Sequence, residues 1–145
     1  MYKTIVLAYD GSEAGQQALL ESQELAQWSH AALWLIAVMP SPVNLAGYDG
    51  SIYIPEIAER DKQRFQSILD DGLKRMAEAG LQAQGELLMG ESVHEIAEFA
   101  RKTQAELIVV GHKHLDSWAA RWWRGSVSGA LIEHAPCSVL CVIKG

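Results

Sequence analysis

Lys3-Thr-Ile-Val-Leu-Ala-Tyr9, followed at once by Asp10-Gly11-Ser12, is the stretch that decides the fold. Its short β-branched, apolar run is typical of a strand buried on both faces of a parallel sheet. After it the period changes to that of a helix, with small and apolar residues at Ala14, Ala18, Leu19, Ser22, Leu25 and Ala26. The Ser12 hydroxyl is expected to cap this helix. A strand therefore runs directly into a helix.

The same alternation continues along the chain. Further strands are predicted at 31–38, 82–89, 106–111 and 138–143, and further helices from Pro55 to about Gly80, from Ser92, and from Gly125 to His134. Ser92 and Glu95 have the spacing of a capping box. Strands that alternate with helices predict an α/β fold, here a five-stranded, mostly parallel open sheet with two helices on each face, Rossmann-like, in a single domain over 1–145.

Charge and composition exclude several classes of partner. The 145 residues include 18 Asp and Glu against 12 Lys and Arg, for a net charge of −6. Nucleic acids and acidic membrane surfaces require a basic face, so neither is expected as a partner. No signal peptide is recognisable, and no apolar run approaches the roughly 20 residues that span a bilayer.

The two cysteines point to a reducing compartment. Cys137 directly precedes the predicted strand 138–143 and Cys141 lies within it, so about 13 Å separates them at ~3.3 Å per residue of extended chain. An intrachain disulfide requires Cα atoms within about 7 Å. We expect two reduced thiols and a cytoplasmic protein, with a bond across a dimer interface as the alternative.

The segment from Gly111 to Ser128 holds the best candidate for a ligand site. Gly111 ends a buried strand, and Gly125 precedes a helix start next to the hydroxyls of Ser126 and Ser128. Free N–H groups at a helix start attract an anion, and glycine allows a phosphate to approach the backbone. A capped helix after a surface loop, with no ligand, explains the same spacing and stays open.

Rival signatures in the chain are weaker. The glycines of 85–92 have P-loop spacing, but Glu91 stands where a phosphate-binding lysine is needed. His112 and His114 have the H-x-H spacing of metal ligands, but we interpret them as part of a polar loop and predict no metal site. Trp118, Trp122 and Trp123 form either a packed cluster, a lid over a ligand or a partner contact.

The sequence resembles the universal stress protein family over nearly its whole length. The resemblance rests on Ile5-Val-Leu-Ala-Tyr-Asp-Gly-Ser12, on Gly90-Glu91 before a helix, on 107–112, and most of all on 125–142. ATP-binding members carry Gly-x2-Gly-x9-Gly-[Ser/Thr]. Gly111 and Gly125-Ser126 match its ends, but His114 replaces the second glycine and the next stretch has ten residues, 115–124, instead of nine. His114 either obstructs the phosphates or contacts them as a cation.

The resemblance implies a fold, a ligand and a partner. The fold is the Rossmann-like, adenine nucleotide alpha hydrolase-like sheet. The ligand is ATP or another adenine nucleotide, with or without Mg²⁺. Asp10 and the Val38 main chain are expected near the adenine, and Ser126 and Val127 near the phosphates. The candidate binding residues are Asp10, Val38, Gly90, Gly111, His114, Gly125, Ser126, Val127 and Ser128. The implied partner is a second copy, paired through strand 138–143, whose edge would otherwise be unpaired.

From these observations we expect a regulatory, adenine-nucleotide-binding protein that acts in stress response, without catalytic residues and with at most slow ATP hydrolysis. The alternative is a dimeric interaction module of the same fold that does not bind ATP.

Overall fold

The computed structural model describes residues 2–41, 55–113 and 127–144, which form five strands and four helices. In chain order they are β1 (Thr4–Ala8), α1 (Glu13–Ser29), β2 (Ala32–Met39), α3 (Pro55–Glu78), β3 (Ala83–Met89), α4 (Ser92–Lys102), β4 (Leu107–Lys113), α6 (Val127–His134) and β5 (Ser138–Lys144). Every predicted strand is present, and β4 continues two residues beyond the predicted end at Gly111.

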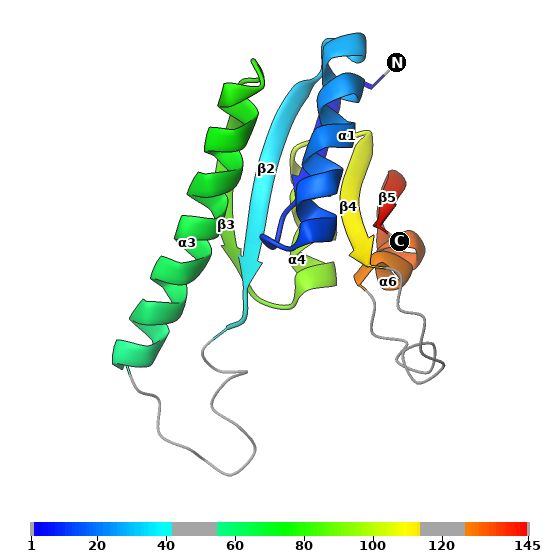
Figure 1. Cartoon of the computed structure of the whole chain (residues 1–145). Coiled ribbons are helices and arrows are strands. Elements are labelled where there is room, and N and C mark those ends of the chain that lie inside the picture. Colours follow the sequence, from blue (N-terminus) through cyan, green and yellow to red (C-terminus); the bar gives the residue numbers. More distant parts are fainter. Residues whose placement is uncertain (1, 42–54, 114–126, 145) are drawn as a thin grey trace.

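All five strands are parallel, in the order β3-β2-β1-β4-β5. The chain first builds outward from β1 through β2 to β3, then returns to the other side of β1 for β4 and β5. Figure 1 shows the strands side by side, with β3 and β5 at the two edges. The predicted five-stranded, open α/β sheet is therefore confirmed.

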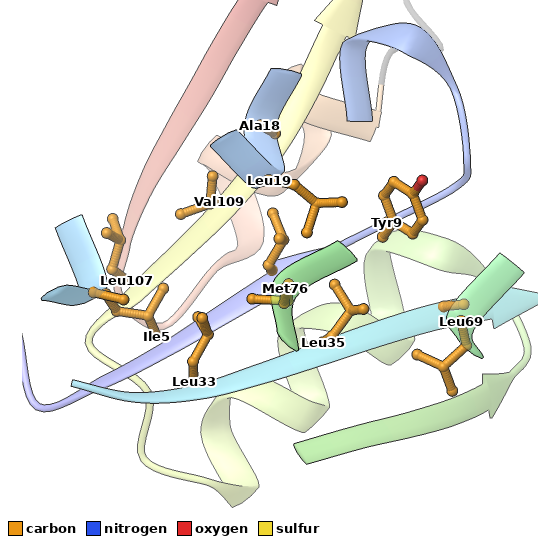
Figure 2. Packing of buried hydrophobic residues seen from close by; sticks show 13 residues of the cluster. Ile5, Tyr9, Ala18, Leu19, Leu33, Leu35, Leu69, Met76, Leu107 and Val109 are labelled. Atoms are coloured by element: carbon orange, nitrogen blue, oxygen red, sulfur yellow. The ribbon is translucent and has the colours of Figure 1, made fainter. Parts of the chain in front are cut away.

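Two apolar cores lie on opposite faces of the sheet, because successive strand residues point to opposite sides. Ile5 and Tyr9 of the first strand segment face α1 and α3, where Leu69 and Met76 complete the packing (Figure 2). Leu7 belongs to the same buried cluster. On the other face, α4 and α6 cover the alternate residues, with Val6, Ile36, Ile96, Phe99, Ala100, Ile108 and Leu131 among the buried side chains. Among the described residues, two helices cover each face, as predicted.

The cap predicted for α1 is present. The Ser12 side chain accepts a hydrogen bond from the Gly15 N–H at 3.0 Å, and the helix ends at His30 in the left-handed conformation. Pro55 begins α3, as predicted, and Gly80 follows its end with φ +83°.

The predicted cap of α4 is wrong. Ser92 is the first residue of the helix, and the cap is Glu91, whose carboxylate accepts from the N–H groups of Val93 at 3.0 Å and His94 at 2.8 Å. The longer Glu91 side chain satisfies two free amides, so the Ser92 hydroxyl is not needed there. Glu95 does not complete a capping box, since its side chain lies against Gly90.

A helix that spans a bilayer needs a long apolar run, and none of the helices within 2–41, 55–113 and 127–144 has one.

Candidate functional site at the carboxyl edge of the sheet

The strand order creates a crevice at the carboxyl ends of β1 and β4. The chain leaves β1 toward β2 on one side and reaches β4 on the other, so the connections diverge between these two strands. Open α/β sheets bind their ligands at such a switch point. In Figure 1 these strand ends lie at the lower edge of the sheet, next to the start of α4.

A cavity of about 160 Å³ occupies this position. It lies between the ends of β1, β2 and β4 and the first turns of α4, and its described lining residues are Ala8, Tyr9, Asp10, Ile36, Val38, Ser92, Ile96, Val110 and Gly111. Most of these side chains are apolar. The polar side chains are the Asp10 carboxylate and the Ser92 hydroxyl, since the Tyr9 ring is buried on the other face of the sheet.

The Asp10 carboxylate is held at the rim by the turn that joins β1 to α1. Its Oδ1 accepts hydrogen bonds from the Ser12 N–H at 2.9 Å and from the Ser12 hydroxyl. Ser12 in turn caps α1 through Gly15. The cap of the helix and the orientation of the carboxylate are therefore one connected arrangement. An ionised carboxylate only accepts hydrogen bonds, so it suits a ligand hydroxyl or amine.

The main chain of Val38 faces the crevice beyond the end of β1. The register between β1 and β2 ends at Ala8 and Ile36, and the last bond runs from the Tyr9 N–H to the Ile36 carbonyl at 2.9 Å. In a parallel sheet, alternate residues direct their backbone groups to the same neighbour. The N–H and C=O of Val38 therefore point toward β1, as those of Ile36 do. At the level of Val38, however, the segment after β1 has already turned away at Asp10, so these two groups face the crevice.

Two glycines at this edge are required by the fold itself, Gly111 by packing and Gly90 by its backbone conformation. A Cβ on Gly111 would lie 2.2 Å from the Ala14 carbonyl oxygen, because the first turn of α1 rests directly on the end of β4. Gly90 has φ +145°, and a Cβ there would lie 2.6 Å from Glu95 Oε1. Both positions exclude a side chain whether or not a ligand is bound.

Size and charge indicate which part of a ligand this cavity suits. At about 160 Å³ it is smaller than the roughly 300–1,000 Å³ of sites that enclose a whole drug-sized molecule. A carboxylate at the rim repels a phosphate, and the first amides of α4 are already occupied by Glu91. The described cavity thus suits a flat, largely apolar group with hydrogen-bonding edges, and an attached anionic group would have to lie outside it.

Three of the predicted binding residues line this cavity, namely Asp10, Val38 and Gly111. Gly90 lies just before α4, where its N–H donates to the Met39 carbonyl at 2.9 Å, and it is not a lining residue. Val127 and Ser128 begin α6, which packs beside α4 on the same face. His114, Gly125 and Ser126 lie outside the described residues.

Several lining residues were missed from the sequence. Ala8, Ile36 and Val110 lie on the same face of the sheet as Val38, a signal that strand alternation offers. Ser92 was interpreted only as a cap. Its contribution to the cavity depends on how α4 packs, which the sequence does not reveal.

No group of three or more His, Cys, Asp or Glu side chains with metal-binding geometry occurs in the described part of the chain. Of the two histidines with H-x-H spacing, His114 lies outside the described residues.

Comparison with known proteins identifies the family. A model of the universal stress protein family matches residues 1–142. The chain belongs to this family. Universal stress protein MJ0531 of Methanocaldococcus jannaschii is 34% identical over 99% of this chain and 84% of its own length. Universal stress protein YxiE of Bacillus subtilis is 31% identical over 98% of this chain and 99% of its own. A solved universal stress family protein from Burkholderia pseudomallei is 29% identical, with a TM-score of 0.73 over 96% of this chain and 95% of that one.

Several universal stress family structures with the same fold contain adenine mononucleotides. One from Archaeoglobus fulgidus is in complex with dAMP, with TM-score 0.68, 23% identity and coverage of 97% and 98% of the two chains. One from Arabidopsis thaliana has AMP bound, with TM-score 0.70, 17% identity and coverage of 98% and 92%. At these identities the likeness shows the fold alone.

Proposed function

We propose that this universal stress family protein binds an adenine nucleotide at the carboxyl edge of its sheet and acts as a regulatory protein in stress response, with at most slow ATP hydrolysis. The observation that carries the proposal is the cavity between β1, β2, β4 and α4, with the Asp10 carboxylate and the Val38 main chain at its edge. Family relatives that contain AMP and dAMP support the choice of ligand.

The hydrogen-bonding groups of this cavity match those of adenosine. The Val38 N–H donates and its C=O accepts, which complements the ring nitrogen and the amino group along one edge of adenine. The Asp10 carboxylate accepts, which suits a ribose hydroxyl. Apolar residues such as Ile36 and Ile96 would contact the faces of the base. In this proposal the phosphates lie toward the start of α6, near Gly125, Ser126, Val127 and Ser128, with or without Mg²⁺.

Calorimetric titration with AMP and with ATP tests this proposal. Ser92→Phe places a phenyl ring at the half-buried Ser92 position and fills the cavity, so AMP affinity should fall at least about tenfold, the equivalent of ~1.4 kcal/mol. Ser67→Phe is the matched control, because Ser67 is exposed on α3 and away from the cavity. Its affinity should equal that of the wild type.

The two nucleotides separate the parts of the proposal. Binding of AMP but not ATP would retain the adenosine cavity and reject ATP as the ligand. If Ser92→Phe and Ser67→Phe bind AMP with equal affinity, the binding site does not include this cavity. If neither nucleotide produces heat with the wild type at millimolar concentration, the nucleotide proposal is wrong.

One observation favours the second candidate function, an interaction module that binds no ATP. Gly111 is required by the close approach of α1, so packing alone accounts for the first glycine of the motif. Calorimetry without heat for either nucleotide would select this function.

We also propose that the protein forms a homodimer through β5. This strand pairs only with β4 among the described strands, so its outer backbone groups have no strand partner. Pairing with the same strand of a second copy would satisfy them in a two-fold arrangement. Light scattering should give a dimer mass at micromolar concentration, and a monomer mass would reject it. Cys137 and Cys141 are both free thiols, which supports our proposal of a cytoplasmic protein.

A further inference from the structure

Ser92 has a side chain that the fold leaves free in the cavity at the carboxyl edge. It is the first residue of α4, it is half-buried, and it lines the cavity together with Asp10 and Val38. Its hydroxyl forms no hydrogen bond with any described residue. The amides that a capping serine would reach are already bound by the Glu91 carboxylate. The Ser92 hydroxyl is therefore available to a ligand.

The first turns of α4 bring this hydroxyl next to an apolar contact. Residues four positions apart are neighbours on one side of a helix, and Ser92 and Ile96 both line the cavity. The Ile96 side chain is buried there against the core on the α4 side of the sheet. The same helix thus presents an apolar surface and, one turn earlier, a hydroxyl.

Only one of the described side chains that line the cavity can donate a hydrogen bond. The Asp10 carboxylate only accepts, and its Oδ1 is already bound by Ser12. The Tyr9 ring is buried on the other face of the sheet, and the remaining lining residues have apolar side chains or none. The side-chain donor among the described lining residues is therefore Ser92.

Adenine has more acceptors than the Val38 main chain can serve. In the proposed arrangement the Val38 N–H donates to one ring nitrogen, and its C=O accepts from the amino group. The ring nitrogens N3 and N7 lie on other edges of the base and remain as acceptors. An acceptor that leaves water without finding a donor weakens binding. A donor on the cavity wall therefore affects how tightly the base is held.

We propose that Ser92 is a specificity-determining residue of this site, whose hydroxyl donates a hydrogen bond to N3 or N7 of the bound adenine. The inference rests on the proposed binding of an adenine nucleotide. Val38 recognises one edge of the base, and Ser92 selects for a ring nitrogen on a second edge. Ile96 packs against the face of the base beside this contact.

Calorimetric titration of the wild type with AMP, 3-deaza-AMP and 7-deaza-AMP tests the proposal. Each analogue replaces one ring nitrogen by C–H, so it lacks a single acceptor. One of the two analogues should bind about fivefold more weakly than AMP, the usual effect of losing one hydrogen bond. The other analogue should bind within about twofold of AMP, because its missing acceptor has no donor in the cavity.

Variants of Ser92 assign the contact. Ser92→Ala should weaken AMP binding about fivefold, and the weaker analogue should then bind as AMP does, since the donor is absent for both. A general effect of the substitution would lower all affinities and keep their ratio. Ser92→Thr retains a hydroxyl and should retain the discrimination. Ser67→Ala, at an exposed position on α3, is the matched control and should equal the wild type with all three nucleotides.

The results that would overturn this role differ from those that reject nucleotide binding. Equal binding of AMP and both analogues by the wild type would reject the role of Ser92 and retain the nucleotide site. An analogue weakened as much in Ser92→Ala as in the wild type would assign the contact to another group. Weakening of both analogues would reject a single hydrogen bond from Ser92. The absence of heat with AMP would reject nucleotide binding and this role together.

Discussion

At the scale of single residues, two reasons account for a glycine at position 111, ligand binding and the packing of α1. The sequence alone does not distinguish them. In the sequence Gly111 matched the first glycine of the family's nucleotide-binding pattern, which suggested a ligand-binding role. In the fold its missing side chain admits the backbone of α1, with Ala14 O 2.2 Å from where a Cβ would be. A glycine in a nucleotide-binding pattern is therefore also a packing residue, and its presence alone does not indicate a ligand.

Replacement of Gly111 tests the packing requirement. Gly111→Ala should lower the free energy of unfolding by about 3 kcal/mol, since a backbone carbonyl cannot move aside as a side-chain tip does. Gly80→Ala is the control, with φ +83° and open space around the position. It should cost only about 1 kcal/mol, from backbone strain. Urea unfolding that gives Gly111→Ala the smaller loss would contradict the close contact.

Tyr9 has a hydroxyl that packing leaves without a partner. The side chain is 3% exposed, and the hydroxyl has no hydrogen-bond partner among the described residues. Burial, followed by the negative charge of Asp71 on α3, raises its pKa above the ordinary 10.0. The folded state thus holds the Tyr9 proton more tightly than the unfolded chain does, a difference that contributes stability below pH 10.0 and is lost as pH rises through the folded pKa.

Tyr9→Phe should therefore change both the level and the pH dependence of stability. At neutral pH we expect a gain of about 1 kcal/mol, because an unsatisfied buried hydroxyl is removed. The fall in stability above pH 10.0 should be smaller in Tyr9→Phe than in the wild type. Urea unfolding of the two proteins across this range measures the difference, and parallel pH curves would contradict the burial of an unpartnered hydroxyl.

At the scale of elements, α4 shows where sequence patterns mislead. Its existence and its buried stripe, including Ile96, Ala97 and Ala100, were predictable from periodicity. Its cap was not, because serine is a preferred cap residue and Glu91 is not. The conformation of Gly90 and the position of the Glu95 side chain decide which residue reaches the free amides, and neither follows from spacing.

Unfolding measurements distinguish the two caps. Glu91→Ala should cost about 1 kcal/mol, since it leaves two amides of α4 without their partner. Ser92→Ala should stay within about 0.5 kcal/mol, as for a substitution outside a cap. The reverse order of the two losses would show that Ser92 caps the helix after all.

At the scale of the whole molecule, the alternation of strands and helices was enough to predict the parallel sheet. The strand order β3-β2-β1-β4-β5 and the position of the crevice follow once the sheet is formed. The family resemblance implied Asp10 and Val38, and both line the cavity. The sequence missed Ser92 and Ile96 as lining residues, since their place in the cavity depends on the angle at which α4 packs.

We propose above all that an adenine nucleotide binds between β1, β2, β4 and α4. A ¹⁵N–¹H NMR titration of the wild-type protein with AMP tests it most directly, because each backbone amide reports on its own surroundings. We predict saturable shifts for Asp10, Val38, Ser92 and Gly111, with the amides of Leu140 and Val142 unchanged. The absence of any shift at millimolar AMP, or shifts confined to α1 and β5, would contradict nucleotide binding at this edge of the sheet.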